Sequence, residues 1–207
     1  MVGGWRKLWG FEFPFYYVQL PILDKPNDDP SGGKRGWQAN RMGMLQALTV
    51  IPNSGMAVTV DVGDANDIRP RNKFDVGERL ALWALAKDYG KTGLVCSGPL
   101  YKAMKVEEGT IRIAFDSVGS GLMVGRKDGR NPAVEDKGAK LARFAIAGED
   151  RKWVWANAII DGKTVIVSSP GVPRPVAVRY AFSMNPQGCN LYNREGLPAS
   201  PFRTDDW

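Results

Sequence analysis

Residues 56–90 read MAVTVDVGDANDIRPRNKFDVGERLALWALAKDYG, and this stretch decides how the first half of the chain folds. The apolar run at 56–60 has the composition of a buried strand. The polar residues 61–72 predict a loop, and the apolar spacing of residues 73–89 predicts a helix with Asn72 as its cap. The order strand, loop and helix indicates an α/β protein, in which functional sites gather beyond the carboxyl ends of strands.

The helix at 73–89 is predicted to bury one apolar face. The apolar residues of this face are spaced three, four and seven residues apart, which places them on one side of a helix. They are Val76, Leu80, Trp83 and Ala84.

Residues 1–93 hold fewer elements than a complete α/β domain needs. The apolar run at 13–20 predicts a second strand covered on both faces, and residues 24–36 predict a surface loop. A second helix is indicated by Trp37, Met44, Leu45 and Leu48. Two strands would leave open sheet edges, whereas a doubly wound sheet has about five or six strands. We therefore expect residues 1–93 to be part of a larger α/β domain.

After residue 93 the pattern changes to short apolar runs separated by turns, with a polar loop at 125–140. Asp161 and Gly162 form a two-residue hairpin signal between two of these runs. Residues 94–207 are therefore predicted to form an all-β sandwich. The runs that predict its strands are 101–106, 110–115, 142–147, 153–160, 164–168 and 176–182.

Composition excludes several classes of function. The net charge of +6 comes from basic residues scattered among acids, which argues against a nucleic-acid partner. No apolar run approaches the roughly 18 residues of a membrane span. Cys96 and Cys189 either pair or lie apart as small buried thiols, and no cysteine cluster indicates a metal site. The chain contains no histidine, which excludes a Ser-His-Asp mechanism built from its own residues.

The loop at 61–72 gathers charged side chains just past a predicted strand. Asp61, Asp64, Asp67, Arg69 and Arg71 all lie in it. One interpretation is the polar wall of a binding or catalytic site. The other is a solvated loop, in which the aspartates accept hydrogen bonds within turns and at the start of the next helix.

The same loop resembles a motif of the sialate O-acetylesterases, which are SGNH-type hydrolases. The family pattern is roughly Asp-x-Gly-(Asp/Glu)-x-x-(Asp/Asn)-Ile-His-Pro-x-(Asn/Asp)-Lys, followed by Asp-Val-Gly-x-Arg-Leu. Further similarity lies at residues 97–102, 144–148 and 196–206. The positions that match the loop motif are Asp61, Gly63, Asp64, Asp67, Ile68, Pro70, Asn72, Lys73 and residues 75–80.

The resemblance implies a fold and a reaction. It implies a partial SGNH-hydrolase domain, flavodoxin-like with three layers, at residues 1–93, followed by the β-sandwich at 94–207. The reaction is hydrolysis of O-acetyl esters on sialic acid or related carbohydrates. A serine attacks the acetyl carbonyl, a histidine relays the proton, and no metal or organic cofactor takes part. The partner is an O-acetylated sugar or glycan, and the expected location is secreted or periplasmic.

This chain departs from the family at the catalytic residues. Arg69 occupies the position of the family histidine, and a guanidinium stays protonated and cannot act as a base. Asp64 and Asp67 are candidates for the acid that would orient the missing histidine. The family's Gly-x-Ser-Asn nucleophile block is not found in this sequence. We therefore expect a truncated or inactive member, whose N-terminal part is encoded separately.

A different class of function rests on the β half alone. Trp153 and Trp155 lie two residues apart on one predicted strand, so both point to the same face. They form either a sugar-stacking face or part of the sandwich core. The alternative function is a non-catalytic carbohydrate-binding or structural module.

Overall fold

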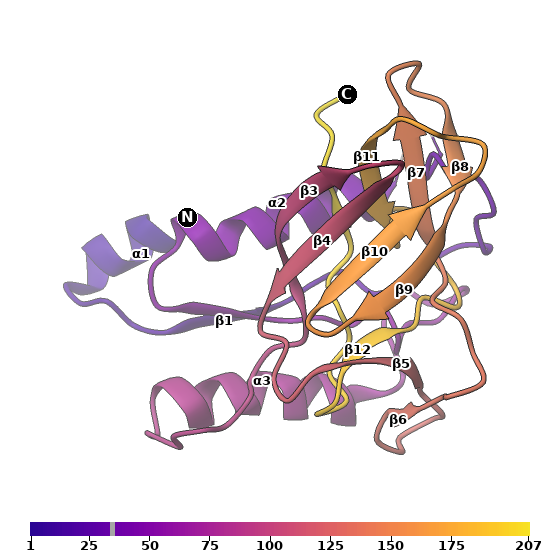
Figure 1. Cartoon of the computed structure of the whole chain (residues 1–207). Helices are drawn as coiled ribbons and strands as arrows, with labels where there is room; N and C mark the ends of the chain where they lie inside the picture. Colours follow the sequence, from indigo (N-terminus) through magenta and orange to yellow (C-terminus); the bar gives the residue numbers. More distant parts are fainter. Residues whose placement is uncertain (34–35) are drawn as a thin grey trace.

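The computed structural model describes residues 1–33 and 36–207, so the predicted loop at 24–36 lies partly outside the described residues. The architecture is mixed α/β, with many antiparallel strands and few helices (Figure 1). None of the helices among the described residues is long and apolar enough to cross a membrane.

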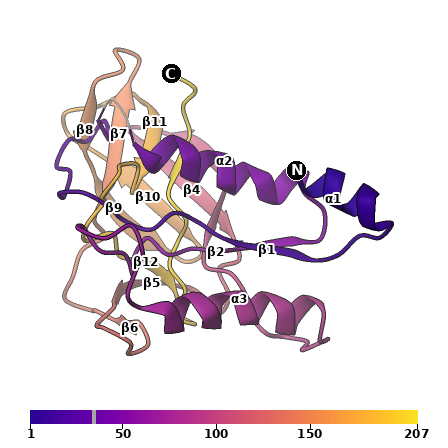
Figure 2. The same cartoon turned by 180° about the vertical axis from the view of Figure 1, so that it is seen from behind.

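The first half of the chain holds a small parallel sheet. Strand β1 (Phe15–Val18) pairs with β2 (Ser54–Ala57), and helices α2 (Trp37–Val50) and α3 (Lys73–Lys87) lie on opposite sides of the pair (Figure 2). A short helix, α1 (Val2–Trp9), precedes β1. The side chains of β1 are half-buried, so the strand is covered on both faces as expected, but only in part.

The expected strand at 56–60 begins and ends earlier in the structure. Pairing stops at Ala57, although Val58 and Val60 remain buried. The Thr59 hydroxyl donates to the carbonyl of Gln19 at 2.6 Å, so side-chain bonding replaces the ladder where β1 has ended. Met56, Val58 and Val60 form a small buried cluster that is the core of this half.

Helix α3 begins as predicted, but its buried positions coincide with the expected apolar face only at Trp83. The Asn72 side chain accepts a hydrogen bond from the Asp75 amide at 3.1 Å and caps the helix. The buried positions are Asp75, Arg79 and Trp83, which are spaced four residues apart. The expected apolar face is wrong in detail, because ion pairs and hydrogen bonds at Asp75 and Arg79 allow charged groups to be buried.

Helix α2 packs Met44, Leu45 and Leu48 against the small buried cluster, as expected, and is also anchored by a buried cation. The Arg41 side chain is fully buried and donates to four backbone carbonyls. Two of them are those of Leu20, at 2.8 Å, and Ser183, at 2.6 Å. The carbonyls of Pro21 and Met184 accept at 2.5 and 3.0 Å. Burial lowers the pKa of Arg41 to about 10. These bonds join the two halves of the chain.

The second half contains two four-stranded antiparallel sheets and one of three strands. The first has the order β3 (Leu100–Glu107), β4 (Thr110–Asp116), β10 (Thr164–Ser168) and β9 (Asn157–Asp161). The second has the order β13 (Phe202–Arg203), β11 (Pro175–Tyr180), β7 (Phe144–Gly148) and β8 (Trp153–Trp155). The third has the order β12 (Leu191–Asn193), β5 (Leu122–Arg126) and β6 (Val134–Glu135).

The predicted hairpin joins β9 to β10, but Asp161 pairs with Thr164, so its two turn residues are Gly162 and Lys163; Gly162 has the positive φ of 60° that such a turn requires. The run at 153–160, predicted as one strand, is two strands in different sheets. The chain crosses between the sheets at Ala156, whose amide donates to the Phe144 carbonyl at 3.0 Å. The predicted polar loop at 125–140 starts too early, because β5 runs to Arg126, and it contains the two residues of β6.

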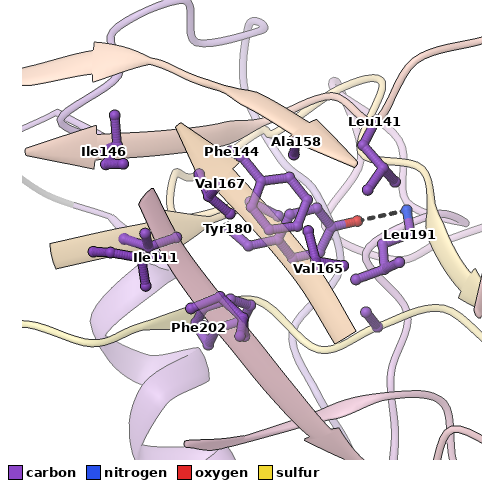
Figure 3. Close-up of a cluster of buried hydrophobic side chains, with 14 of the residues drawn as sticks. Ile111, Leu141, Phe144, Ile146, Ala158, Val165, Val167, Tyr180, Leu191 and Phe202 are labelled. Carbon is purple, nitrogen blue, oxygen red and sulfur yellow. Dashed lines mark hydrogen bonds between the residues drawn. The ribbon is translucent and has the colours of Figure 1, made fainter. Parts of the chain in front are cut away.

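The two four-stranded sheets face each other across one apolar core (Figure 3). Inside it, the buried Tyr180 hydroxyl accepts a hydrogen bond from the Leu191 amide at 2.9 Å, which satisfies both polar groups. All of the buried members of this core lie between Ile111 and Phe202 in the sequence. They include Ile111, Ile113, Phe115, Phe144, Ile146, Val165, Val167, Val178, Tyr180, Leu191 and Phe202.

Candidate functional site

The loop after β2 is tied down at its first residue. The Asp61 carboxylate forms a two-pronged ion pair with Arg79 of α3, with Oδ1–Nη1 at 2.6 Å and Oδ2–Nη2 at 2.8 Å. The two side chains are 3% and 6% exposed. Burial alone would lower the pKa of Arg79, but the bonds and charge of Asp61 outweigh it and raise that pKa. Asp61 is thus engaged in holding the loop to the helix.

Tyr192 of β12 completes this buried cluster. Its hydroxyl donates to Oδ2 of Asp61 at 3.2 Å. Burial, together with the neighbouring Asp61 carboxylate, raises the pKa of the Tyr192 phenol well above its usual range. The phenol therefore stays protonated and remains a donor to the carboxylate. The cluster connects β12 from the second half of the chain to the loop of the first half.

Asp64 and Asp67 are used within the loop itself. Oδ1 of Asp64 accepts from the Asn66 amide, and Oδ1 of Asp67 accepts from the Arg69 amide, each at 2.9 Å. Such bonds to the amide two residues ahead shape tight turns. In the part of the chain that the structure describes, no ion pair joins either carboxylate to the Arg69 guanidinium, and Arg69 is exposed. Asp64, Asp67 and Arg69 therefore lie near one another on the same loop, and both carboxylates are hydrogen-bonded to backbone amides of that loop.

A buried lysine fastens the polar loop of the β half over the start of α3. Lys127 Nζ lies 2.6 Å from Oδ2 of Asp75, with the two side chains 8% and 6% exposed. The same ammonium donates to the carbonyls of Gly129 at 2.7 Å and Asn131 at 2.9 Å. One lysine therefore orders its own loop and neutralises the acid in the first turn of the helix.

A polar hollow of about 380 Å³ opens beside this lysine. Its wall combines the ends of two segments, the loop at 61–72 and the loop that follows β5. Three cationic side chains and one carboxylate lie on it, so its wall is mainly positive. The lining residues are Asp61, Val62, Gly63, Arg71, Asn72, Lys127, Gly129 and Arg130.

Neither cysteine has the character of a nucleophile. Both thiols are free, so they do not pair with each other. Burial raises the pKa of Cys189 to about 12, and burial likewise raises the pKa of Cys96. A raised pKa keeps a thiol protonated and unreactive. Among the described residues, no group of three or more histidine, cysteine or acidic side chains is arranged to hold a metal ion.

The two tryptophans of β8 lie opposite small residues of β7, with Trp153 against Ala147 and Trp155 against Ala145. Guanidinium groups cover both rings. The Arg179 Cζ atom is 4.0 Å from the centroid of Trp153, and the Arg143 Cζ atom is 5.4 Å from that of Trp155. Trp153 is half-buried, whereas Trp155 is 42% exposed.

Sequence reasoning missed Arg79, Lys127 and Tyr192 as members of the site. Arg79 carried a signal, because it lies four residues from Asp75 and from Trp83 and so shares their face of the helix. Lys127 and Tyr192 come from the β half, and nothing in their local sequence indicates that they meet the loop at 61–72.

No family model matches the chain, but the curated relatives that it resembles are all sialate O-acetylesterases. It is 29% identical over 205 residues to sialate O-acetylesterase of Homo sapiens, covering 92% of this chain and 36% of that protein. The same enzyme of Rattus norvegicus is 28% identical over 224 residues, covering 98% and 39%. That of Mus musculus is 30% identical over 207 residues, covering 92% and 35%.

The fold has a close counterpart among solved structures. A carbohydrate acetylesterase from Xanthomonas citri matches all of this chain with a TM-score of 0.85 and 42% sequence identity. The match covers 45% of the Xanthomonas protein, so this chain spans less than half the length of each protein that it resembles. In sequence and in structure, the chain belongs with the sialate and carbohydrate O-acetylesterases.

Proposed function

We propose that this chain is one portion of an esterase that hydrolyses O-acetyl esters on sialic acid or related carbohydrates. The observation that carries the proposal is the match of the whole chain to the carbohydrate acetylesterase, at 42% identity. Residues 1–93 are proposed to be part of an SGNH-type domain and residues 94–207 a β-sandwich, in a protein that is secreted or periplasmic.

The proposed role of the chain is to supply one wall of the active site. The loop at 61–72 forms that wall, because it follows β2 and is held by Asp61, Arg79 and Tyr192. Arg69 occupies the position of the family's base and is exposed on this loop. A permanently protonated guanidinium cannot take a proton from a serine, so the chain alone is proposed to be inactive.

The first experiment measures hydrolysis of an aryl acetate and of O-acetylated sialic acid by the purified chain. No turnover above background is expected. Working enzymes typically turn over about 1–10³ times per second, so a rate within about 10²-fold of that range would contradict the proposal.

The second experiment tests the position of the base. This chain is joined to the part of the Xanthomonas acetylesterase that it does not cover, and the Arg69→His variant is compared with its parent across pH. A general base contributes about 10²–10⁴-fold to the rate, so the variant is expected to be at least about 10²-fold faster than its parent. Its rate should rise with an apparent pKa of roughly 6–7, as for an imidazole. Equal rates in two well-folded proteins would refute the assignment of Arg69.

A non-catalytic carbohydrate-binding module is the second candidate, and one observation favours it. Trp155 is 42% exposed on β8, with the Arg143 guanidinium over its ring. A flat aromatic surface of this kind stacks on sugar rings. The test is binding of O-acetylated and unmodified sialic acid by the chain and by Trp155→Ala. Binding by the parent that the variant loses supports this function, and no binding by either excludes it.

A further inference from the structure

The two outer edges of the parallel sheet differ in whether their backbone amide and carbonyl groups have hydrogen-bond partners. On the outer edge of β2, the Met56 carbonyl accepts from the Trp83 indole at 3.1 Å, and the Val58 carbonyl accepts from Arg79 at 2.6 Å. A Cβ atom on Gly55 would lie 2.4 Å from the Trp83 ring, so glycine is what lets α3 approach this closely. Side chains of α3 therefore close this edge to another strand.

The outer edge of β1 is open. The amides of Phe15 and Gln19 donate to Asn53 and Ala57 at 3.0 and 2.9 Å, so these odd-numbered residues face β2. Because the direction of backbone groups alternates along a strand, the amide and carbonyl groups of Tyr16 and Val18 point the other way. Within residues 1–33 and 36–207, the sheet has no third strand that would pair with them.

Large apolar side chains are exposed beside the start of this strand. Trp5, Leu8 and Trp9 of α1 are 40%, 78% and 59% exposed, and Phe11 is 61% exposed. Soluble proteins rarely expose this many large apolar side chains close together unless these side chains contact another protein segment or a ligand.

Helix α1 is fixed to the segment that enters β1. Nε and Nη2 of Arg6 donate to the Phe13 carbonyl at 3.1 and 2.6 Å. The Trp9 and Phe13 rings are 4.8 Å apart, and the Trp5 and Phe15 rings are 6.4 Å apart. The apolar helix is therefore attached to the beginning of the open strand.

We propose that the outer edge of β1 and the exposed side chains of α1 form one docking surface for the remainder of the esterase fold. Its occupant is a parallel strand with its covering helix, from the part that the relatives have beyond the length of this chain. This inference rests on the proposed function, because that part is the one in which the nucleophile is expected.

Three observations select this occupant. The pair β1–β2 is parallel, and parallel sheets are found with several strands and with both faces covered. The Xanthomonas relative contains the whole of this chain within 45% of its own length, so more than half of that protein remains to fill the surface. A second copy of this chain is disfavoured, because a two-fold axis at β1 would pair the two strands antiparallel, whereas the existing pair is parallel.

The test uses two separate polypeptides. One is the full chain of 207 residues, and the other is the part of the Xanthomonas acetylesterase that this chain does not cover. Binding is measured by sedimentation and calorimetry, and hydrogen exchange is followed at the Tyr16 and Val18 amides. We expect a 1:1 complex with a dissociation constant of about 1 μM or tighter, in which both amides become protected.

Two variants separate the strand edge from the helix. Val18→Pro removes an amide that points away from β2, so the existing ladder stays intact. Leu8→Ser removes an exposed apolar side chain. Each is expected to melt close to the parent and to weaken binding at least tenfold. Ile159→Ser is the matched control, because Ile159 is exposed on β9 in the second half, and its binding should equal that of the parent.

Several outcomes would overturn the docking surface. They are no binding at 100-fold above the expected dissociation constant, unchanged binding by both variants, or a dimer of this chain alone that Leu8→Ser dissociates. The esterase rate is a separate readout. A complex that forms as expected, but stays inactive when it carries Arg69→His, would refute the catalytic proposal and leave the docking surface standing.

Discussion

Asp61 and Arg79 share two hydrogen bonds, at 2.6 and 2.8 Å, in a position where both side chains are almost fully buried. Removing one partner of such a pair leaves an uncompensated buried charge. We expect Asp61→Ala to lower the free energy of unfolding by about 3–5 kcal/mol, measured by urea denaturation. Asp116→Ala is the control, because its 2.7 Å pair with Lys102 is exposed and should contribute less than about 1 kcal/mol. Similar losses in both variants would show that Asp61 is not held as described.

Lys127 is predicted to control the order of the loop that follows β5. Replacing it with methionine removes the ion pair to Asp75 and both bonds to loop carbonyls. We expect Lys127→Met to be about 3 kcal/mol less stable and to be cut faster by trypsin after Arg130. Lys105→Met serves as the control, since the Lys105 ammonium is exposed and 3.5 Å from Glu107. An unchanged rate of cleavage after Arg130 would argue against this role.

The half-buried phenol of Tyr17 is expected to make the protein less stable at high pH. Burial raises the pKa of its phenol to about 12, from a usual value of 10. Between these values the folded protein keeps a proton that the unfolded chain loses, so the free energy of unfolding falls as the pH rises from 10 to 12. Tyr17→Phe should show a shallower fall across that window. Tyr89→Phe, at an exposed position, should follow the parent. Parallel curves for the parent and Tyr17→Phe would exclude this contribution.

The two halves of the chain are predicted to differ when they are expressed apart. Residues 94–207 contain every buried member of the main core, whereas the first half has only a small cluster around Met56, Val58 and Val60. We expect residues 94–207 to melt cooperatively and residues 1–93 to aggregate, as followed by calorimetry and light scattering. A monomeric fragment 1–93 with a cooperative transition would contradict the interpretation of this half as part of a larger domain.

Local patterns were sufficient for elements whose partners are close in sequence. The cap at Asn72 and the hairpin at Gly162 depend on neighbouring residues, and both are present. The run at 153–160 failed as a single strand because the change of sheet at Ala156 is decided by contacts with β7 and β10, which strand propensity does not report.

The position of the loop at 61–72 was predictable from the sequence, but the side chains that hold it were not. The loop at 61–72 follows β2 as expected, and Asp64, Asp67 and Arg69 lie on it. The groups that hold the site, Lys127 and Tyr192, arrive from the second half of the chain. Their approach depends on how the two halves pack, and that packing is built from long-range contacts that no local pattern specifies.

The carbonyl cage around Arg41 has a consequence for the way the protein is made. Two of its oxygens belong to Ser183 and Met184, which lie 142 and 143 residues further along the chain. At translation rates of about 5–20 residues per second, these carbonyls emerge roughly 7 to 28 s after the arginine. Until then its guanidinium must remain hydrated, so α2 cannot reach its final position before Ser183 and Met184 have been synthesised.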